Sequence, residues 1–104
     1  MKYRIKYLPT FAADRDVIRA HLSRFYDGTE KRFFTLVRKK IKQLKDFPLM
    51  YPVFEFDPNY RKMVIGDYLL FYIVDEDNKM VEIHRIFHGA QDIRIEFTTT
   101  YSEK

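Results

Sequence analysis

Residues 63–89 read MVIGDYLLFYIVDEDNKMVEIHRIFHG, and this stretch decides the fold of the chain. It contains two long apolar runs, 68–75 and 80–88, which are separated by a polar loop. Runs of this length, rich in β-branched and aromatic residues and bounded by turn residues, predict two β-strands joined as a hairpin. A shorter run, 61–65, precedes a tight Gly66-Asp67 turn and predicts another strand. The sequence therefore predicts three consecutive antiparallel strands.

The middle run, 68–75, carries apolar side chains on both faces. A strand of this kind is covered on both faces, so we expect it to lie inside the sheet. The last run, 80–88, differs from the middle run because it contains polar side chains. Strand alternation predicts that its side chains divide between the two faces of the sheet. One set is Glu82, His84, Ile86 and His88, and the other is Val81, Ile83, Arg85 and Phe87.

Two imidazoles and a carboxylate are thus expected on one face, close to Gly89, where the strand ends. Four residues of a strand span roughly 13 Å, so His84 and His88 are too far apart to bind one metal ion. His21 has no partner nearby in the sequence, and we interpret it as structural. The chain has no Cys, which excludes disulfides, thiolate metal sites and a Cys nucleophile. We expect no metal and no cofactor.

A strand and a helix are expected at the start of the chain. Residues 2–8 alternate basic and apolar side chains, which predicts a half-buried or edge strand. Pro9 ends this strand, and Thr10 is suited to cap a following helix. Apolar side chains then recur at roughly helical spacing as far as Phe25. The first helix is therefore predicted between Thr10 and the Asp27-Gly28 break.

A second helix follows at once. Asp27 and Glu30 have the spacing of a capping box, and apolar positions continue at helical spacing to Leu44. The next segment, 46–59, is too rich in Pro for a helix and too apolar for a free linker, so we expect it to pack on the core. Beyond the last strand, a further short strand is suggested by Ile93, Ile95 and Phe97.

These elements follow the order β-α-α-β-β-β in one domain, residues 1–104. We predict an α+β fold, in which an N-terminal strand and a helical hairpin precede a mainly antiparallel sheet and the hairpin packs on one face. A chain of 104 residues with 46% hydrophobic residues can form one core. No apolar run approaches the roughly 20 residues that cross a bilayer, and the first ten residues lack an apolar signal region. We therefore expect a cytoplasmic protein without a membrane partner.

Positive charge is concentrated in one segment. The formal net charge is +4, but residues 29–47 contain seven basic side chains and two acidic ones. A polyanion or an acidic partner would be attracted to this segment. The alternative is that these residues form only the solvated face of an amphipathic helix. The basic residues are Lys31, Arg32, Arg38, Lys39, Lys40, Lys42 and Lys45.

Three sequence blocks, RKMVIGDY (61–68), LFY (70–72) and IFHGAQD (86–92), follow one another in the predicted sheet. With the order of elements, they resemble the RelE/ParE superfamily of toxins from bacterial type II toxin-antitoxin systems. The third block is the most specific and is typical of ParE-like and plasmid-stabilisation members. The resemblance implies a RelE/ParE-like fold and a toxin that inhibits growth until a cognate antitoxin neutralises it.

Two mechanisms are known in this superfamily, inhibition of DNA gyrase and cleavage of mRNA on the ribosome. Cleavage needs an acid, a base and cations that hold the phosphate. His88 is the best acid or base, because imidazole titrates near neutral pH. Arg61, Lys62 and Arg85 are the candidate phosphate-binding residues, with Arg having the better geometry.

The histidines and Arg85 each have a structural alternative. His84 and His88 can both be ordinary, partly exposed strand residues. Arg85 can be a buried guanidinium that pairs with a carboxylate of the first helix, either Asp14 or Asp16.

The sequence also departs from the ribonuclease pattern of RelE. Leu69 and Gln91 stand where those members carry Arg, and their C-terminal Tyr has no clear counterpart, Phe97 being nearest. The departures favour either a binding-type toxin or a ribonuclease built around histidines. We expect ParE-like inhibition of gyrase, with a ribosome-dependent endoribonuclease that uses His88 as the alternative. A third possibility is an inert relative that only binds its antitoxin. A basic hairpin and an open sheet edge suit an acidic, partly disordered antitoxin that folds on binding.

Overall fold

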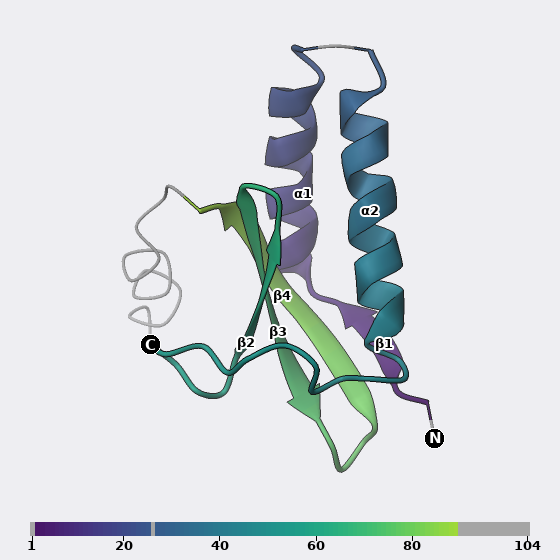
Figure 1. The fold of residues 1–104 in the computed structure, drawn as a ribbon, viewed down its shortest axis with the longest axis vertical. Helices are drawn as coiled ribbons and strands as arrows, with labels where there is room; N and C mark the ends of the chain where they lie inside the picture. Colours follow the sequence, from purple (N-terminus) through teal and green to yellow (C-terminus); the bar gives the residue numbers. More distant parts are fainter. Residues whose placement is uncertain (1, 26, 90–104) are drawn as a thin grey trace.

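The computed structural model describes residues 2–25 and 27–89 (Figure 1). The elements are β1 (Arg4–Tyr7), α1 (Pro9–Leu22), α2 (Thr29–Gln43), β2 (Arg61–Ile65), β3 (Tyr68–Asp75) and β4 (Met80–His88). The predicted order is confirmed, and the last three strands have the predicted bounds. The strand suggested by Ile93, Ile95 and Phe97 lies outside the described residues. In the described ranges, neither helix is long and apolar enough to cross a bilayer.

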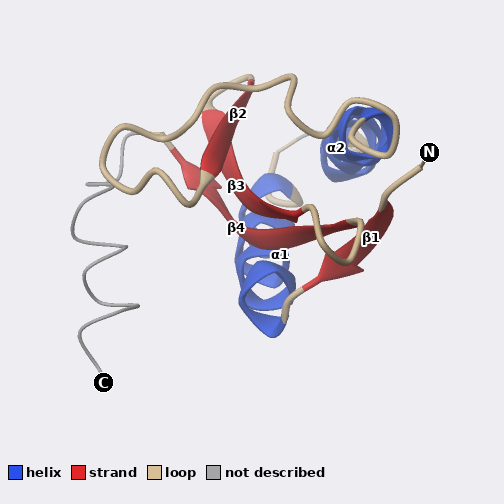
Figure 2. Ribbon diagram, turned by 90° about the horizontal axis from the view of Figure 1, so that it is seen from below, coloured by secondary structure: helices blue, strands red, loops and turns tan. Residues whose placement is uncertain are grey.

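The four strands form one mixed sheet in the order β1-β4-β3-β2. β3 lies between β4 and β2 and is antiparallel to both, as its apolar faces predict. β1 joins the sheet beside the first half of β4 and runs parallel to it, from Arg4 opposite Met80 to Tyr7 opposite Ile83. Figure 2 shows β1 and β2 at opposite edges of the twisted sheet. The α+β prediction is therefore confirmed, with a parallel pair at one edge.

The two helices and one face of the sheet enclose the larger core. The helices lie side by side and antiparallel (Figure 1). Their buried apolar side chains recur at helical spacing, so one stripe of each helix is turned inward. The sheet contributes buried side chains from β2, β3 and β4. Members of this core include Phe11, Ile18, Phe34, Val37, Ile41, Leu44, Met63, Ile65, Leu70, Tyr72, Val81, Ile83 and Ile86.

The start of α1 differs from the prediction. Leu8 precedes the helix, and Pro9 occupies its first turn, where the missing N–H of proline costs nothing. The Thr10 hydroxyl does not cap α1 but donates a hydrogen bond to the carbonyl oxygen of His84 at 2.6 Å. The helix ends at Leu22, so the periodicity that runs to Phe25 overestimates its length.

The start of α2 also differs. Gly28 precedes the helix with a φ of 88°, a conformation that glycine adopts without steric cost, and no side chain caps the helix. The predicted capping box of Asp27 and Glu30 is therefore wrong. Glu30 instead forms an ion pair with Arg19 of α1 at 3.1 Å. Glu30 therefore makes a contact between the two helices in place of the predicted cap at the start of α2.

The connection between α2 and β2 packs on the sheet, as predicted. Phe54 and Tyr60 from this connection join Phe71 and Phe87 in a second, smaller core on the face opposite the helices. On the other face, the Tyr72 hydroxyl donates to the carbonyl of Pro48 at 2.8 Å. Burial of this phenol raises the pKa of Tyr72 to about 12. The sheet is therefore covered by helices on one face and partly by this connection on the other.

Candidate functional site

A β-bulge divides β4 into two halves. Arg85 pairs with Phe71, whereas Ile83 pairs with the next residue of β3, Tyr72, so His84 is the extra residue. A bulge inserts one residue into a strand and shifts the alternation of every side chain after it. Ile83 before the bulge and Ile86 after it both belong to the larger core. The faces of the second half of β4 are therefore the reverse of those that strict alternation predicts.

The two imidazoles consequently lie on opposite faces. The His84 ring contacts the Tyr60 ring edge-on, with centroids 5.1 Å apart, beside the smaller core. The His88 ring contacts Tyr68, a member of the larger core, with centroids 5.3 Å apart. The prediction that both imidazoles share one face is wrong, because the bulge at His84 reverses the faces of the residues that follow it.

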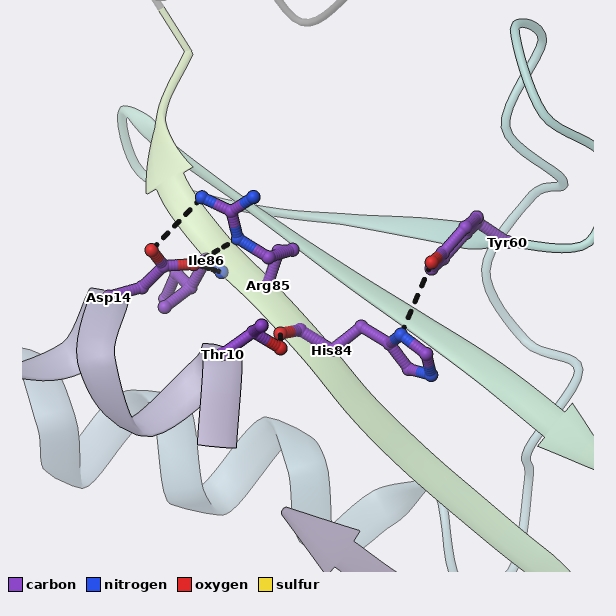
Figure 3. Close-up of polar contacts among 6 residues, drawn as sticks. All are labelled: Thr10, Asp14, Tyr60, His84, Arg85 and Ile86. Carbon is purple, nitrogen blue, oxygen red and sulfur yellow. Dashed lines mark hydrogen bonds and ion pairs between the residues drawn. The ribbon is translucent and has the colours of Figure 1, made fainter. Parts of the chain in front are cut away.

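Arg85 and Asp14 connect β4 to α1 (Figure 3). The Arg85 Nε donates to Asp14 Oδ2 at 2.7 Å, and one terminal nitrogen donates to Oδ1 at 3.1 Å. The same Oδ2 accepts the main-chain N–H of Ile86 at 3.0 Å. Both side chains are largely buried, with exposed fractions of 18% and 16%. The predicted pairing of Arg85 with a helix carboxylate is confirmed, and the partner is Asp14.

Thr10 and Asp14 bond to the main chain of β4 where β1 does not pair with it. They lie one turn apart on α1 and bond to the carbonyl of His84 and the N–H of Ile86. β1 borders only the first half of β4, so side chains of α1 satisfy main-chain groups along the second half. The guanidinium of Arg85 also lies over the Phe87 ring, 5.3 Å from its centroid. These contacts fix the position of Arg85.

A groove lies between α1 and the end of β4, which we call the α1–β4 groove. Its volume is about 600 Å³, and His88 and Arg85 both line it. His21, from the last turn of α1, lines it as well. The sequence interpretation treated His21 as structural, although helical spacing from Asp14 predicts that the two side chains share a face. The remaining lining residues are Asp14, Val17, Ile18, Tyr68, Ile86 and Phe87.

A hydrogen-bonded chain of Glu82, His84 and Tyr60 lies on the opposite face. A carboxylate only accepts hydrogen bonds, so the His84 Nε2–H donates to Glu82 Oε1 at 3.3 Å. The Nδ1 atom then accepts from the Tyr60 hydroxyl at 3.2 Å. Burial lowers the pKa of His84, and the hydrogen bond and charge of Glu82 oppose this shift. Both ring nitrogens are engaged within the fold.

Arg61 and Lys62 lie away from the α1–β4 groove and from each other. Arg61 is next to the α2–β2 connection, where its guanidinium donates to the carbonyl of Tyr51 at 2.7 Å. The neighbouring Lys62 faces the smaller core, with its ammonium 5.9 Å from the centroid of the Phe54 ring. Lys62 and Arg85 are both in register with Phe71, so a strand separates them.

The predicted catalytic set is thus only partly assembled. His88 and Arg85 line one groove, while Arg61 and Lys62 belong to other surroundings. Within residues 2–25 and 27–89, no group of three or more His, Asp or Glu side chains is placed to hold a metal ion.

A comparison with family models finds one match, over residues 5–93, to the model described as the ParE toxin of type II toxin-antitoxin system, parDE. No curated protein matches the chain.

Solved structures of toxins share the fold. The toxin-antitoxin complex RelBE2 from Mycobacterium tuberculosis is 20% identical, with coverage of 88% of this chain and 95% of that one and a TM-score of 0.59. The isolated E. coli RelE toxin is 11% identical, with coverage of 94% and 96% and a TM-score of 0.61. The chromosomal ParDE system from P. aeruginosa is 22% identical, with coverage of 84% and 96% and a TM-score of 0.59.

Proposed function

Because this chain belongs to the ParE toxin family of type II toxin-antitoxin systems, we propose that it stops bacterial growth by binding and inhibiting DNA gyrase. In this proposal a cognate antitoxin binds the toxin and neutralises it. Toxin-antitoxin complexes are among the solved structures with the same fold, which supports such a partner.

The dispersal of the cationic side chains supports a binding mechanism over RNA cleavage. A phosphate-cleaving site needs cations that converge on one point and are available to the developing charge. Here the Arg61 guanidinium donates to a main-chain carbonyl, and Arg85 forms two hydrogen bonds with Asp14. Leu69, at a position where RelE ribonucleases carry Arg, is apolar and packs against the smaller core. Inhibition by binding requires no such convergence.

A supercoiling assay with purified gyrase tests the proposal. Addition of the purified chain is expected to abolish supercoiling of relaxed plasmid, and premixing with the antitoxin is expected to restore it. A cell-free translation reaction with the same amount of chain serves as the control and should proceed normally. If translation stops with cuts in ribosome-bound mRNA while gyrase stays active, gyrase is not the target. If growth is unaffected by expression, the chain is an inert relative.

The second candidate function is a ribosome-dependent endoribonuclease, and the α1–β4 groove favours it. His21, His88 and Arg85 all line this groove, which provides two groups that can act as acid or base and one guanidinium. In this mechanism His88 removes or returns a proton, and Arg85 holds the phosphate. Arg61 and Lys62 would act from outside the groove, on the flanking RNA.

Two His variants separate the groove from the rest of β4. If the chain is a ribonuclease, His88→Ala abolishes mRNA cleavage, whereas His84→Ala retains it, because His84 lies on the opposite face. Equal loss in both variants would contradict an active site in the α1–β4 groove. If both variants still cleave mRNA, neither His84 nor His88 is catalytic.

A further inference from the structure

The outward face of α2 carries a group of exposed basic side chains, which we call the α2 basic face. The opposite side of the helix carries the buried stripe of Phe34, Val37 and Ile41. The helix lies at the margin of the molecule with this stripe on the core (Figure 1), so the basic face is turned to solvent. Its members are Lys31, Arg32, Arg38, Lys39 and Lys42.

The cations of this face are not neutralised within the fold. None of them lies within 4.0 Å of a carboxylate among residues 2–25 and 27–89. Glu30 is the acidic residue of α2, and it is paired with Arg19 of α1 at 3.1 Å. Arg32 and Arg38 donate to the hydroxyls of Thr29 at 3.5 Å and Thr35 at 3.4 Å. Hydroxyls carry no charge, so the positive charge of the face remains available to a polyanion.

The same charges work against the stability of α2. Lys31 and Arg32 occupy its first turn, where the helix dipole favours Asp or Glu. Arg38 and Lys42 are four residues apart, a spacing at which like charges repel each other on a helix. A face that serves only solubility mixes both signs, since pairs of opposite charge stabilise the helix. The arrangement therefore indicates a surface that binds a negatively charged partner.

The spacing of the cations fits the phosphates of a nucleic-acid duplex. Arg32 and Lys39 are seven residues apart, so they lie on one line along α2, about 10.5 Å from each other. Lys31, Arg38 and Lys42 lie on a neighbouring line that extends over roughly 16 Å. Each strand of a duplex carries one phosphate per about 3.4 Å of axis, so this length presents about five phosphates of one strand.

The face lacks the groups that other polyanionic partners need. Single-stranded nucleic acid is held by aromatic side chains that stack on its bases. The aromatic residues of α2 are turned to the core instead, since Phe34 is buried and Phe33 packs against Tyr68. Acidic proteins need apolar anchors as well as charge, and Leu36, which is 41% exposed, is the exposed large apolar side chain of α2. Duplex DNA requires neither.

We propose that the α2 basic face binds the phosphate backbone of duplex DNA. Contacts to phosphates carry no sequence information, so this binding does not depend on sequence. The inference rests on the proposed function for its setting, because gyrase acts on duplex DNA. The DNA held by gyrase becomes a second contact for the chain, and two linked contacts raise the effective concentration of the chain at the enzyme.

Fluorescence anisotropy of a labelled duplex of about 20 base pairs measures the interaction without gyrase. The unmodified chain should bind with a Kd between about 1 and 100 μM at physiological salt, the range of sequence-independent binding. A duplex of unrelated sequence should give the same Kd within about threefold. Contact with four or five phosphates predicts that the logarithm of the association constant falls against the logarithm of salt concentration with a slope of about −4.

Charge reversal locates the site. Arg32→Glu with Lys39→Glu should raise the Kd for the duplex at least about tenfold and make the salt slope shallower by about 2. Circular dichroism during heating establishes that the variant is folded. Its unfolding temperature should not fall, because Glu replaces a cation in the first turn of α2.

The matched control is Lys6→Glu with Lys79→Glu, which makes the same change in net charge. Both residues are exposed, one in β1 and the other in the turn before β4. Ile5 packs against the larger core, so strand alternation directs Lys6 to the face of the sheet away from the helices. This variant should alter the Kd for the duplex less than about threefold.

A supercoiling assay measures what the DNA contact contributes to inhibition. Arg32→Glu with Lys39→Glu should require about tenfold more chain for half-inhibition of gyrase at physiological salt. The Lys6 and Lys79 variant should inhibit as the unmodified chain does.

The outcomes distinguish the surface from the function. If both charge reversals weaken duplex binding equally, or the unmodified chain does not bind the duplex, the inference is overturned, and inhibition of gyrase would still uphold the proposed function. If a single-stranded RNA of equal length binds more tightly than the duplex and depends on Arg32 and Lys39, the face is an RNA site and the inference is likewise overturned. If the duplex binds at α2 but gyrase stays active, the proposed function fails and the DNA-binding surface stands.

Discussion

The cations of the sheet and the cations of the second half of α2 have different surroundings. Along β2 and β4, Arg61 donates to a carbonyl of the connection and Arg85 donates to Asp14. On α2, Arg38 donates to the Thr35 hydroxyl at 3.4 Å, and neither Arg38 nor Lys42 lies within 4.0 Å of a carboxylate among the described residues. A largely buried guanidinium that bonds within the fold contributes to stability, whereas an exposed one with a single long contact is available to another molecule. The sequence alone does not distinguish these two classes of basic residue.

The largest effect on stability is expected from Asp14→Ala. This change leaves the Arg85 guanidinium and the Ile86 N–H without their shared acceptor, and it should lower the free energy of unfolding by about 2–3 kcal/mol. Chemical denaturation measures the loss. Asp16→Ala is the control, because Asp16 is 69% exposed and its nearest cation is Arg15 at 3.6 Å. A loss in the control equal to that in Asp14→Ala would contradict a special role for the α1–β4 link.

A smaller effect should separate the two classes of cation within one experiment. Arg61→Met removes the 2.7 Å hydrogen bond to Tyr51 and should lower the free energy of unfolding by roughly 1–2 kcal/mol. Arg38→Met removes an exposed charge and a 3.4 Å contact with Thr35, and it should change the free energy of unfolding by less than about 0.5 kcal/mol. The same denaturation curves compare the two variants. Equal losses would remove the distinction between bonded and available cations.

The smallest effect should be the pH dependence that arises from His84. Burial holds its pKa below the usual value in the folded chain, so between the two pKa values the unfolded chain binds more protons. The free energy of unfolding is therefore expected to fall as pH drops below about 6.5, the ordinary His value, and to level off below the folded pKa. His84→Gln should remove this part of the slope. An unchanged slope in that variant would contradict burial of the ring.

The strands were predictable because their signals are local. The turn at Gly66 and the alternation through β2, β3 and β4 depend only on neighbouring residues, and the observed bounds match. The pairing of Arg85 with a carboxylate of α1 was also predictable, since a largely buried guanidinium requires a partner. Asp14 rather than Asp16 follows from its position on the face of α1 next to β4.

The bulge at His84 was not predictable from the same signals. In residues 80–88 the alternation of apolar Val81 and Ile83 with Glu82 breaks at the polar pair His84-Arg85, but such a pair also fits a regular strand that buries Arg85. The bulge places Ile86 in the larger core and Phe87 in the smaller one, and Thr10 and Asp14 bond to the main chain beside it. These are long-range contacts, and they decide which face each imidazole occupies. The predicted helix caps were wrong for a similar reason, because Thr10 and Glu30 make tertiary contacts instead.

The parallel pairing of β1 with β4 has a consequence for synthesis on the ribosome. β1 is made before both helices, β2 and β3, whereas its partner strand β4 is made after them. Joining segments so distant in sequence costs chain entropy and makes this step a late one in folding. A nascent chain that stops before β4 therefore lacks the docked β1 edge and the α1–β4 groove alike. The docked edge strand and the groove would form in the same step.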